Sequence, residues 1–585
     1  MRRCMIAFCT RNIYANPYRN QYRRVVMKHL QCRSLLIFAV ATVALQGCNE
    51  YPNPPPMADL APVGVTLLDG LGSHSMPVSG GHPEVQRWFD QGLNLTYGFN
   101  HDAAERSFLR ATELDAECAM CWWGASLVLG PHVNAGMDPA INAAAWDRLQ
   151  RAQAAAANAP EREQAYIRAL AARYTEQPVD DRRPLDEAYA AAMAELVRAY
   201  PDDLDAATLH AEALMNLQPW DYWDEQGRPK GNTAEFVARL ESIIERNPDH
   251  PGALHLYIHA VEASEAPERG VPAADRLRDL VPAAGHLVHM PAHIYARVGR
   301  YNDAVIANQK AIAADDNYLA ACRPSPGVYP LGYVPHNHHF LWFAATMGGA
   351  SETAMQAAES TRERTSDPEL MRTPGFEAMQ YFALTPLFAM VRFGRWDDIA
   401  ATPAPDADLP YMVAMWQYAQ GVAAVRQGRI DQAKAYHGEL LQAGSDPVIE
   451  AMYVWERYSL VHGVRIAERT LAAEIAGAAG NTEVAITALR EAIAIEDALP
   501  YDEPPGWHMP VRHPLGAVLL AEGMPAEAEA VYREELRRNP ENGWSLYGLN
   551  QALLAQERTD AAAAVGARFE HAWAHADVRL AASQF

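Results

Sequence analysis

The chain has 585 residues, of which 49% are hydrophobic, and a formal net charge of −23. This acidic balance argues against nucleic acid and anionic lipid as partners, because both would repel the chain. Only seven cysteines occur, and the chain is long enough to bury a large core of its own, so a small fold built on disulfides is excluded.

The first 47 residues read as a signal peptide, so residues 1–47 are set apart from the fold. A basic stretch that includes Arg23 and Arg24 precedes the apolar run SLLIFAVATVAL. This run is too short to span a bilayer as a helix, but it suits the core of a signal peptide. Met27 would give a leader of normal length, so the start of the chain is open between Met1 and Met27.

The apolar run ends in Leu-Gln-Gly-Cys48, which resembles the lipobox of bacterial lipoproteins, in which the cysteine is lipidated and becomes the new N-terminus. Asn49 follows, and by resemblance to enterobacterial sorting a residue other than Asp here favours the outer membrane. We therefore expect a protein on the periplasmic side of the bacterial outer membrane, attached through its N-terminal lipid only. The alternative is an ordinary signal peptide with a chance cysteine.

Residues 48–82 form the lipidated N-terminus and a Pro-rich tether. From about residue 83, apolar residues recur at i, i+3, i+4 and i+7 between Gly, Asn or Pro, which predicts consecutive helices and almost no sheet. Residues 97–115, 299–312 and 522–540 match the tetratricopeptide-repeat (TPR) signature of small residues, an aromatic residue near the turn and Ala-rich spacing. The predicted fold class is therefore all-α, a TPR-type solenoid of helical hairpins.

Two long connections interrupt the predicted array, at 315–335 and 497–511. Connections of this length in a compact solenoid are often functional, although they can also simply cover a groove. We expect the array to bend near 367–375 into two lobes, an N-terminal solenoid lobe at 83–366 and a C-terminal solenoid lobe at 367–585.

Cys118 and Cys121 form a CxxC motif at the start of a predicted helix. A lone CxxC without a second pair is weak evidence for a zinc site. We favour a structural role, either as two small buried residues or as a local disulfide in an oxidising compartment.

Two histidine pairs lie one TPR period apart. His255 and His259 precede His289 and His293 by 34 residues each, which is the length of one TPR repeat. Equivalent positions of successive repeats face the same side of a solenoid, so we expect the four imidazoles to converge on the concave groove. Glu262 lies on the same helix stripe as the first pair.

Three more histidines flank these pairs. Pro291 belongs in the first turn of a helix, so we expect that helix to begin near 288–291. His286 and the histidine at 289 would then lie at the helix entry, still facing the groove. In the next repeat, His336 and His339 share a helix face at i and i+3.

These residues together predict a metal or polar-ligand site. The candidate metal ligands are His255, His259, His286, His289, His293, His336, His339 and Glu262. Neutral imidazole is a common ligand for zinc, copper and non-haem iron, so the metal would be copper, zinc or iron, and seven histidines could hold two ions. The alternative is that the histidines are half-buried polar residues that bond backbone groups and cap helices.

Several longer strings occur in one order along the chain. They are PWDYW (219–223), NPDHPGALHLYIHAVEAS (247–264), GHLVHMPAHIYARVGRY (285–301), PHNHHF (335–340), YDEPPGW (501–507) and PENGWSLYGL (540–549). With these strings the chain resembles a family of uncharacterised, often exported bacterial TPR proteins that carry HxxxH, HMPxHIY and PHNxHF motifs. The resemblance implies a TPR solenoid and supports the histidine motifs as part of the design, but it implies no settled reaction.

The expected function is that of a lipid-anchored periplasmic scaffold whose concave groove binds protein or peptide partners and carries the histidine site. The alternative is a metal-dependent (copper, zinc or iron) enzyme or a metal carrier that uses the histidine cluster. An enzyme would need an open coordination position and a general acid or base, and the sequence supplies the residue types without their geometry. No catalytic residue is predicted, and the sequence leaves open whether the protein is an enzyme.

Overall fold

The described part of the chain is a row of helices. The structure is a computed structural model whose described residues are 66–322, 324, 327–455 and 457–585. The predicted signal peptide, Cys48 and the tether up to residue 65 lie outside the described residues. Across the described ranges the only sheet pairs the two-residue strands β1 (Tyr453–Val454) and β2 (Tyr458–Ser459), as the sequence pattern predicts. None of the described helices is both long and apolar enough to cross a membrane.

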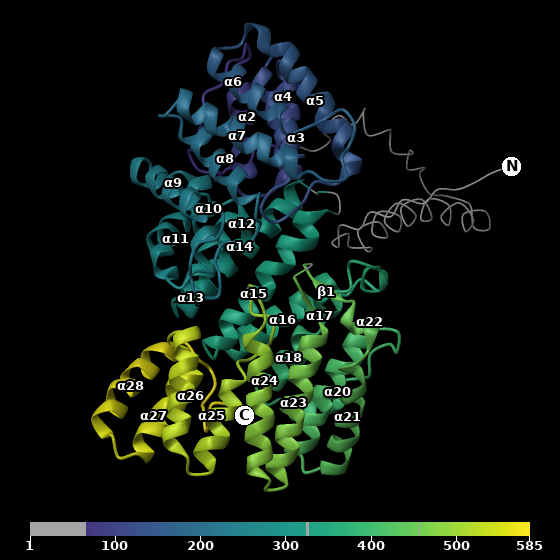
Figure 1. Cartoon of the computed structure of the whole chain (residues 1–585), viewed down its shortest axis with the longest axis vertical. Coiled ribbons are helices and arrows are strands. Elements are labelled where there is room, and N and C mark those ends of the chain that lie inside the picture. The colour runs from purple at the N-terminus through teal and green to yellow at the C-terminus, as the bar shows by residue number, and fades with distance from the viewer. Residues whose placement is uncertain (1–65, 323, 325–326, 456) are drawn as a thin grey trace, which may run out of the picture.

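The first half of the array occupies the upper part of Figure 1. Its α-helices are α2 (Val85–Tyr97), α3 (His101–Leu114), α4 (Ala119–Leu127), α5 (Asn142–Ala155), α6 (Glu161–Ala171), α7 (Arg183–Ala199), α8 (Leu204–Met215), α9 (Thr233–Arg246), α10 (Pro251–Val261), α11 (Val271–Leu277), α12 (Gly285–His289), α13 (Pro291–Arg297) and α14 (Tyr301–Cys322). Short helical turns between them are η2 (Pro139–Ile141), η3 (Ala156–Asn158) and η4 (Pro267–Gly270).

The second half continues downward and turns back toward the first (Figure 1). Its α-helices are α15 (Val334–Met347), α16 (Ser351–Thr365), α17 (Met379–Ala383), α18 (Thr385–Arg392), α19 (Trp396–Ala401), α20 (Pro410–Arg426), α21 (Ile430–Ala443), α22 (Pro447–Glu450), α23 (Val461–Ala478), α24 (Thr482–Asp497), α25 (Arg512–Ala521), α26 (Pro525–Arg538), α27 (Gly543–Ala555) and α28 (Thr559–Ala572). A π-helical turn, η5 (Tyr329–Tyr333), precedes α15, and the turn η6 (Leu370–Arg372) follows α16.

Neighbouring helices pack as hairpins along the chain, such as α2 with α3, α15 with α16, and α27 with α28. One hairpin cannot bury its apolar face alone, so successive hairpins stack and share a continuous core. The predicted all-α, TPR-type solenoid is confirmed. The expected connection at 315–335 is shorter than predicted, because α14 continues to Cys322 and η5 winds directly into α15.

Two hydrophobic cores meet on α15. Phe340 and Ala344 belong to the core of the first half, whereas Leu341 and Trp342 belong to that of the second half. The same helix is therefore covered on both faces. The two cores meet on α15, one helix before residue 366, and the expected boundary between the lobes stays a prediction.

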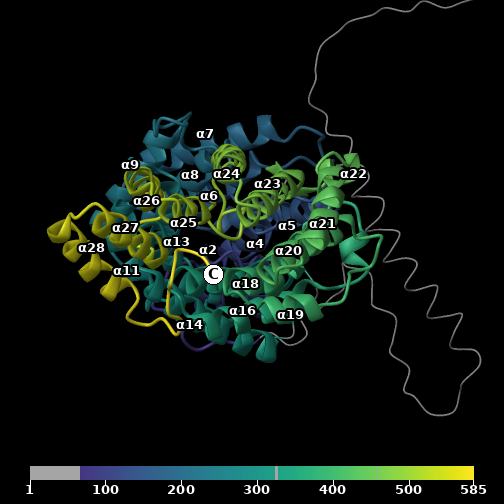
Figure 2. The same ribbon diagram turned by 90° about the horizontal axis from the view of Figure 1, so that it is seen from below.

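The last hairpins return to the middle of the molecule. Figure 2 shows the second half as a curved row around the C-terminus. The Arg297 guanidinium donates to the Arg538 carbonyl, and the Trp544 indole N–H donates to the Thr346 carbonyl at 3.0 Å. Phe585 packs against Trp544, so the C-terminal segment fills the inner face of the last repeats.

Glycines hold the hairpins close together at both ends of the array. An added Cβ at Gly92 (α2) or Gly124 (α4) would lie 2.7 or 2.5 Å from the ring of Phe108 on α3, which stands between them. Gly516 and Gly548 hold the ring of Tyr532 in the same way, with distances of 2.3 and 2.2 Å. An aromatic ring held between two glycines of adjacent repeats is the packing that the TPR signature predicts.

We predict that Gly124→Ala lowers the free energy of unfolding by about 1–3 kcal/mol, because the methyl group overpacks a rigid ring. Gly438→Ala is the matched control, since Gly438 lies inside α21 and an added Cβ meets nothing within 4 Å. This second change is expected to be neutral or to stabilise by up to about 1 kcal/mol through helix propensity. Thermal unfolding of both variants checks the prediction, and equal shifts in midpoint would contradict it.

Candidate metal centre

Six histidines converge where α10, α12, α13 and α15 pack side by side. The structure divides them into a first triad, His255, His259 and His286, and a second triad, His289, His293 and His336. Within each triad one ring nitrogen of every histidine lies within 4.8 Å of the others. Five of the six side chains are at most 2% exposed, and His336 is half-buried.

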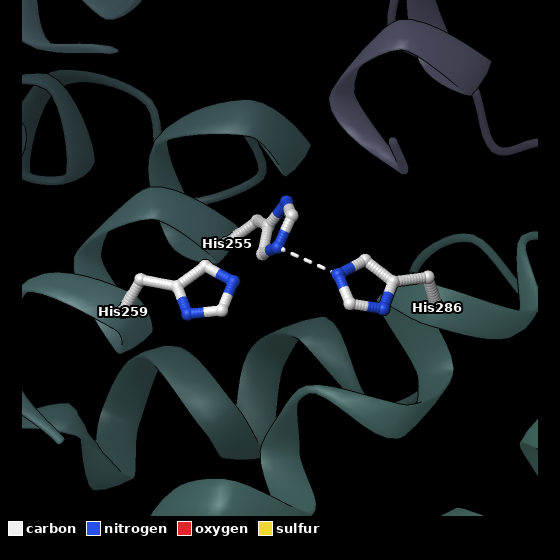
Figure 3. Close-up of side chains that lie close together, drawn as sticks. All are labelled: His255, His259 and His286. Atoms are coloured by element: carbon white, nitrogen blue, oxygen red, sulfur yellow. Dashed lines mark hydrogen bonds between the residues drawn. The ribbon is translucent and has the colours of Figure 1, made fainter. Parts of the chain in front are cut away.

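In the first triad, α10 and α12 point their imidazoles at one another (Figure 3). The Nε2 atoms of His255 and His286 are 3.2 Å apart. The ring centroid of His259 lies 4.8 Å from that of His255 and 6.3 Å from that of His286. Nδ1 of His286 and Nε2 of His259 are buried without a hydrogen-bond partner among the described residues.

In the second triad, the Nε2 atoms of His289 and His293 are 2.6 Å apart. The ring of His336 stands 4.7 Å from that of His289 and 5.8 Å from that of His293, measured between centroids. Three helices therefore contribute one imidazole each to a single point.

Two of the histidines are oriented by neutral oxygen acceptors. Nδ1–H of His255 donates to the Tyr97 carbonyl at 2.6 Å. Nδ1–H of His289 donates to Oδ1 of Asn308 at 2.7 Å, and the Asn308 amide is fixed by its own donation to the Ala304 carbonyl. Each of these imidazoles therefore keeps its Nε2 lone pair free to face the triad.

Two others are oriented by one carboxylate. Glu262 is fully buried; its Oε1 accepts from Nδ1 of His259 at 2.8 Å and its Oε2 from Nδ1 of His293 at 2.7 Å. The Tyr501 hydroxyl donates to the same Oε2 at 3.0 Å, and Glu503 also accepts from Nδ1 of His293. A carboxylate or carbonyl on one imidazole nitrogen, with the other nitrogen directed inward, is the usual outer-shell arrangement of metal-bound histidine.

Burial keeps most of the cluster neutral. It lowers the pKa of His255, His286, His289 and His336 well below the ordinary value, and neighbouring histidines lower it further. Burial also lowers the pKa of His259. Neutral imidazoles carry the lone pairs that a metal ion requires.

His293 differs in its charge. Burial opposes protonation, but the carboxyl groups of Glu503 and Glu262 outweigh it and raise the pKa of His293 to about 10. Burial and the charge of Glu262 raise the pKa of Glu503 well above its ordinary value. Burial would also raise the pKa of Glu262, but the charge of His293 and several hydrogen bonds hold it well below that value. Without metal, the His293 proton on Nε2 thus lies between the rings of His293 and His289.

Aromatic side chains close the first triad. The ring of Phe99 stacks on those of His259 and His286, with centroids 6.1 and 5.5 Å apart, and Trp220 meets His259 edge-on at 5.2 Å. Phe99 and Trp220 both have positive φ, +53° and +64°. Such backbone strain in non-glycine residues is concentrated at functional sites.

A third group of potential ligands, His74, Asp205 and His250, has a structural role instead. Oδ1 of Asp205 accepts from His74 at 2.9 Å and from the Tyr97 hydroxyl at 2.7 Å. His250 lies 3.4 Å from the same oxygen, and its Nδ1 caps α10 by accepting from the Ala253 N–H. The oxygen and nitrogen atoms here are already engaged in hydrogen bonds.

Two of the predicted metal ligands, His339 and Glu262, belong to neither triad. His339 lies outside both triads, on the side of α15 that carries Trp342 and faces Tyr381 and Phe382 of α17. Glu262 lies beside the triads, where it orients two histidines, and with His259 and Glu503 it forms a further group of donor atoms within 4.8 Å of one another that could hold a metal ion. The lone CxxC is a disulfide between Cys118 and Cys121, one of the two structural alternatives expected for it.

The expectation that a helix begins near 288–291 is confirmed, because α13 begins at Pro291. The helix α12 begins at Gly285, and Met290 has helical dihedral angles that join it to α13 at Pro291. The proline fits the first turn of α13, where its missing N–H costs no helical hydrogen bond. The difference from the expectation is that His286 and His289 belong to a short preceding helix, α12, and not to an irregular helix entry.

The sequence reading missed Tyr501 and Glu503. Both lie in the long connection at 497–511, whose length alone marked it as a candidate functional loop. Arg457 donates to the Tyr501 carbonyl, and the Tyr458 hydroxyl donates to Asp502 at 2.8 Å, so the second half of the array holds this loop over the histidines.

No protein-family model and no curated protein sequence matches the chain. Among solved structures, the APC/C hetero-tetramer Cut9–Hcn1 matches at 15% identity over 82% of this chain and 78% of that one, with a TM-score of 0.30. The human IFIT1 dimer with m7Gppp-AAAA matches at 12% identity over 84% and 91%, also at 0.30. TM-scores this low carry no argument, so the fold class depends on the helices themselves.

We predict that His293→Gln destabilises the metal-free protein by about 3–5 kcal/mol near pH 6.5, because Glu262 then stays buried without its charged partner. The raised pKa of His293 means that its stabilising effect is present in full below the ordinary pKa near 6.5 and is lost as the pH rises through about 10. Urea unfolding in a chelator at pH 6.5, 8 and 10 checks this. If the difference in free energy of unfolding between wild type and variant does not become smaller as the pH rises, the prediction is contradicted.

Proposed function

We propose that this TPR solenoid is a transition-metal protein that binds its metal at the two histidine triads. The observation that carries the proposal is the orientation of His255, His259, His289 and His293. Each donates Nδ1–H to an oxygen, and each directs Nε2 into a buried cluster of further imidazoles. Half-buried histidines that only cap helices or bond the backbone would not share one orientation toward a common point.

The donor set favours copper or zinc over iron. Six imidazoles supply the inward-facing atoms, whereas the carboxylate of Glu262 is used on the outer side of His259 and His293. Imidazole suits zinc and copper, and copper binds nitrogen sites most tightly among the divalent first-row metals. The non-haem iron sites of oxygenases usually include a direct carboxylate ligand.

Three protein ligands per ion leave a coordination position open for water or a substrate, as in catalytic zinc sites. The centre is also covered by Phe99, Trp220 and the loop that bears Tyr501 and Glu503, which would slow the exchange of ions. These features support a metal-dependent enzyme more than a metal carrier.

A scaffold function depends on the concave groove. At α10, α12 and α13 the histidines are at most 2% exposed, so a peptide in that part of the groove would have to displace the covering residues. A protein or peptide partner that binds elsewhere on the array stays a prediction.

We predict that the full protein, purified from the periplasm or loaded with zinc or copper after chelation, contains tightly bound metal. The double variant His255→Ala/His293→Ala should lose at least nine-tenths of it, because one ligand of each triad is removed. The double variant His571→Ala/His575→Ala is the matched control, since both of its histidines are exposed. Elemental analysis of both checks the prediction, and wild-type protein that takes up neither metal would overturn the proposal.

We further propose that the protein is anchored to the periplasmic side of the outer membrane through lipidated Cys48. The LQGC string supports this, and the Cys118–Cys121 disulfide is compatible with an oxidising compartment. In a bacterial host, Cys48→Ala should abolish incorporation of a fatty-acid label and release the protein from the membrane fraction. Cys322→Ala, which changes the free cysteine instead, should leave both unchanged. Labelling that persists in the Cys48 variant would contradict this.

A further inference from the structure

The geometry points to a dinuclear centre: two transition-metal ions, one in each histidine triad, close enough to share a bridging hydroxide or water. This inference depends on the proposed function, because it specifies how many ions the histidines hold and how the ions are related. It follows from the spacing of the rings, from the shared carboxylate and from the nitrogen positions.

The two triads adjoin each other without a spacer. Across the boundary between them, the ring of His259 lies 5.9 Å from that of His293, and the ring of His286 lies 5.9 Å from that of His289. Within the triads the corresponding distances run from 4.6 to 6.3 Å. Rings of neighbouring triads are therefore as close as rings of the same triad.

One carboxylate fixes the two triads relative to each other. Oε1 of Glu262 holds His259 of the first triad, and Oε2 holds His293 of the second. The two oxygens of a carboxylate are rigidly linked, so the Nε2 atoms of these two histidines cannot move independently. Glu503 holds His293 directly and reaches His259 of the first triad only through its hydrogen bond to Glu262.

The nitrogen positions suit one ion per triad. Two nitrogens on a tetrahedral ion with bonds of about 2.0–2.1 Å are about 3.3 Å apart, and the Nε2 atoms of His255 and His286 are 3.2 Å apart. In the second triad, the 2.6 Å between His289 and His293 is a hydrogen-bond length. An ion between these two nitrogens would move them apart by about 0.7 Å, to the roughly 3.3 Å of a tetrahedral site.

Six imidazoles around one ion would leave no open position and would require histidines of both triads to reach the same point. Three ligands per ion would leave each ion a free position, which a shared oxygen ligand could fill. Two ions about 3.5–4 Å apart that share an oxygen ligand can activate a nucleophile on one ion and stabilise developing charge on the other.

The number of ions bound by the full chain tests the inference. Chelator-treated protein is titrated with Zn²⁺ by calorimetry, and the metal retained after gel filtration is measured by elemental analysis. We expect two ions per chain in the wild type. His286→Ala, which changes only the first triad, and His336→Ala, which changes only the second, should each retain one. His339→Ala, on the same helix as His336 but outside both triads, should retain two.

The outcomes separate this inference from the proposed function. One ion in the wild type would overturn the dinuclear centre and leave the metal site standing, whereas none would overturn both. Two ions retained in both His286→Ala and His336→Ala would show that the ions bind elsewhere, and would also overturn the inference. Circular dichroism of each variant confirms that it is folded before metal is counted.

A second pair of variants tests the shared carboxylate. Glu262→Gln should weaken the binding of both ions by about 10–100-fold, since an amide cannot accept from both histidines and carries no charge. Glu503→Gln should weaken the ion of the second triad more than that of the first, because its carboxyl group contacts His293 directly and His259 only through Glu262. Two ions that respond equally to Glu503→Gln, or only one that responds to Glu262→Gln, would contradict the role of Glu262 as the link.

Discussion

The fully buried carboxylate of Glu262 is the constraint on which the centre depends. A carboxylate in the protein interior is costly unless every lone pair is used. Here the oxygens accept from His259, His293 and Tyr501. These three bonds stabilise the charge, and two of them also fix the orientation of two imidazole rings. The same interaction that makes the buried charge tolerable thus directs both Nε2 atoms inward.

The fold and the location of the centre could be predicted from the sequence because both follow from the repeat. A 34-residue offset places equivalent residues on the same side of neighbouring hairpins, and His255, His259, His289 and His293 indeed lie together. The small residues and aromatic rings of the TPR signature likewise predict the contacts between hairpins, as at Phe108.

The rest depends on features that periodicity does not encode. The i, i+3 spacing of His336 and His339 predicts that they share a face of α15. However, α15 is buried on two sides, and the spacing does not predict which neighbouring helix each histidine contacts. Local proline rules predict the start of α13 at Pro291, but not the short helix α12 that precedes it and carries two of the histidines. Glu503 is 210 residues from His293 along the chain, and no local pattern connects the two. Their contact exists only because the array curves back on itself.

That curvature has a consequence for the order in which the protein is made. Tyr501 is 239 residues beyond Glu262, so ribosomes have finished every predicted histidine ligand long before the residues that cover them are synthesised. An N-terminal half that folds first exposes its imidazoles without their lid and with Glu262 only partly bonded. The mature environment of the centre is therefore a property of the complete polypeptide, and a nascent or truncated chain would hold any captured ion in a looser, more accessible form.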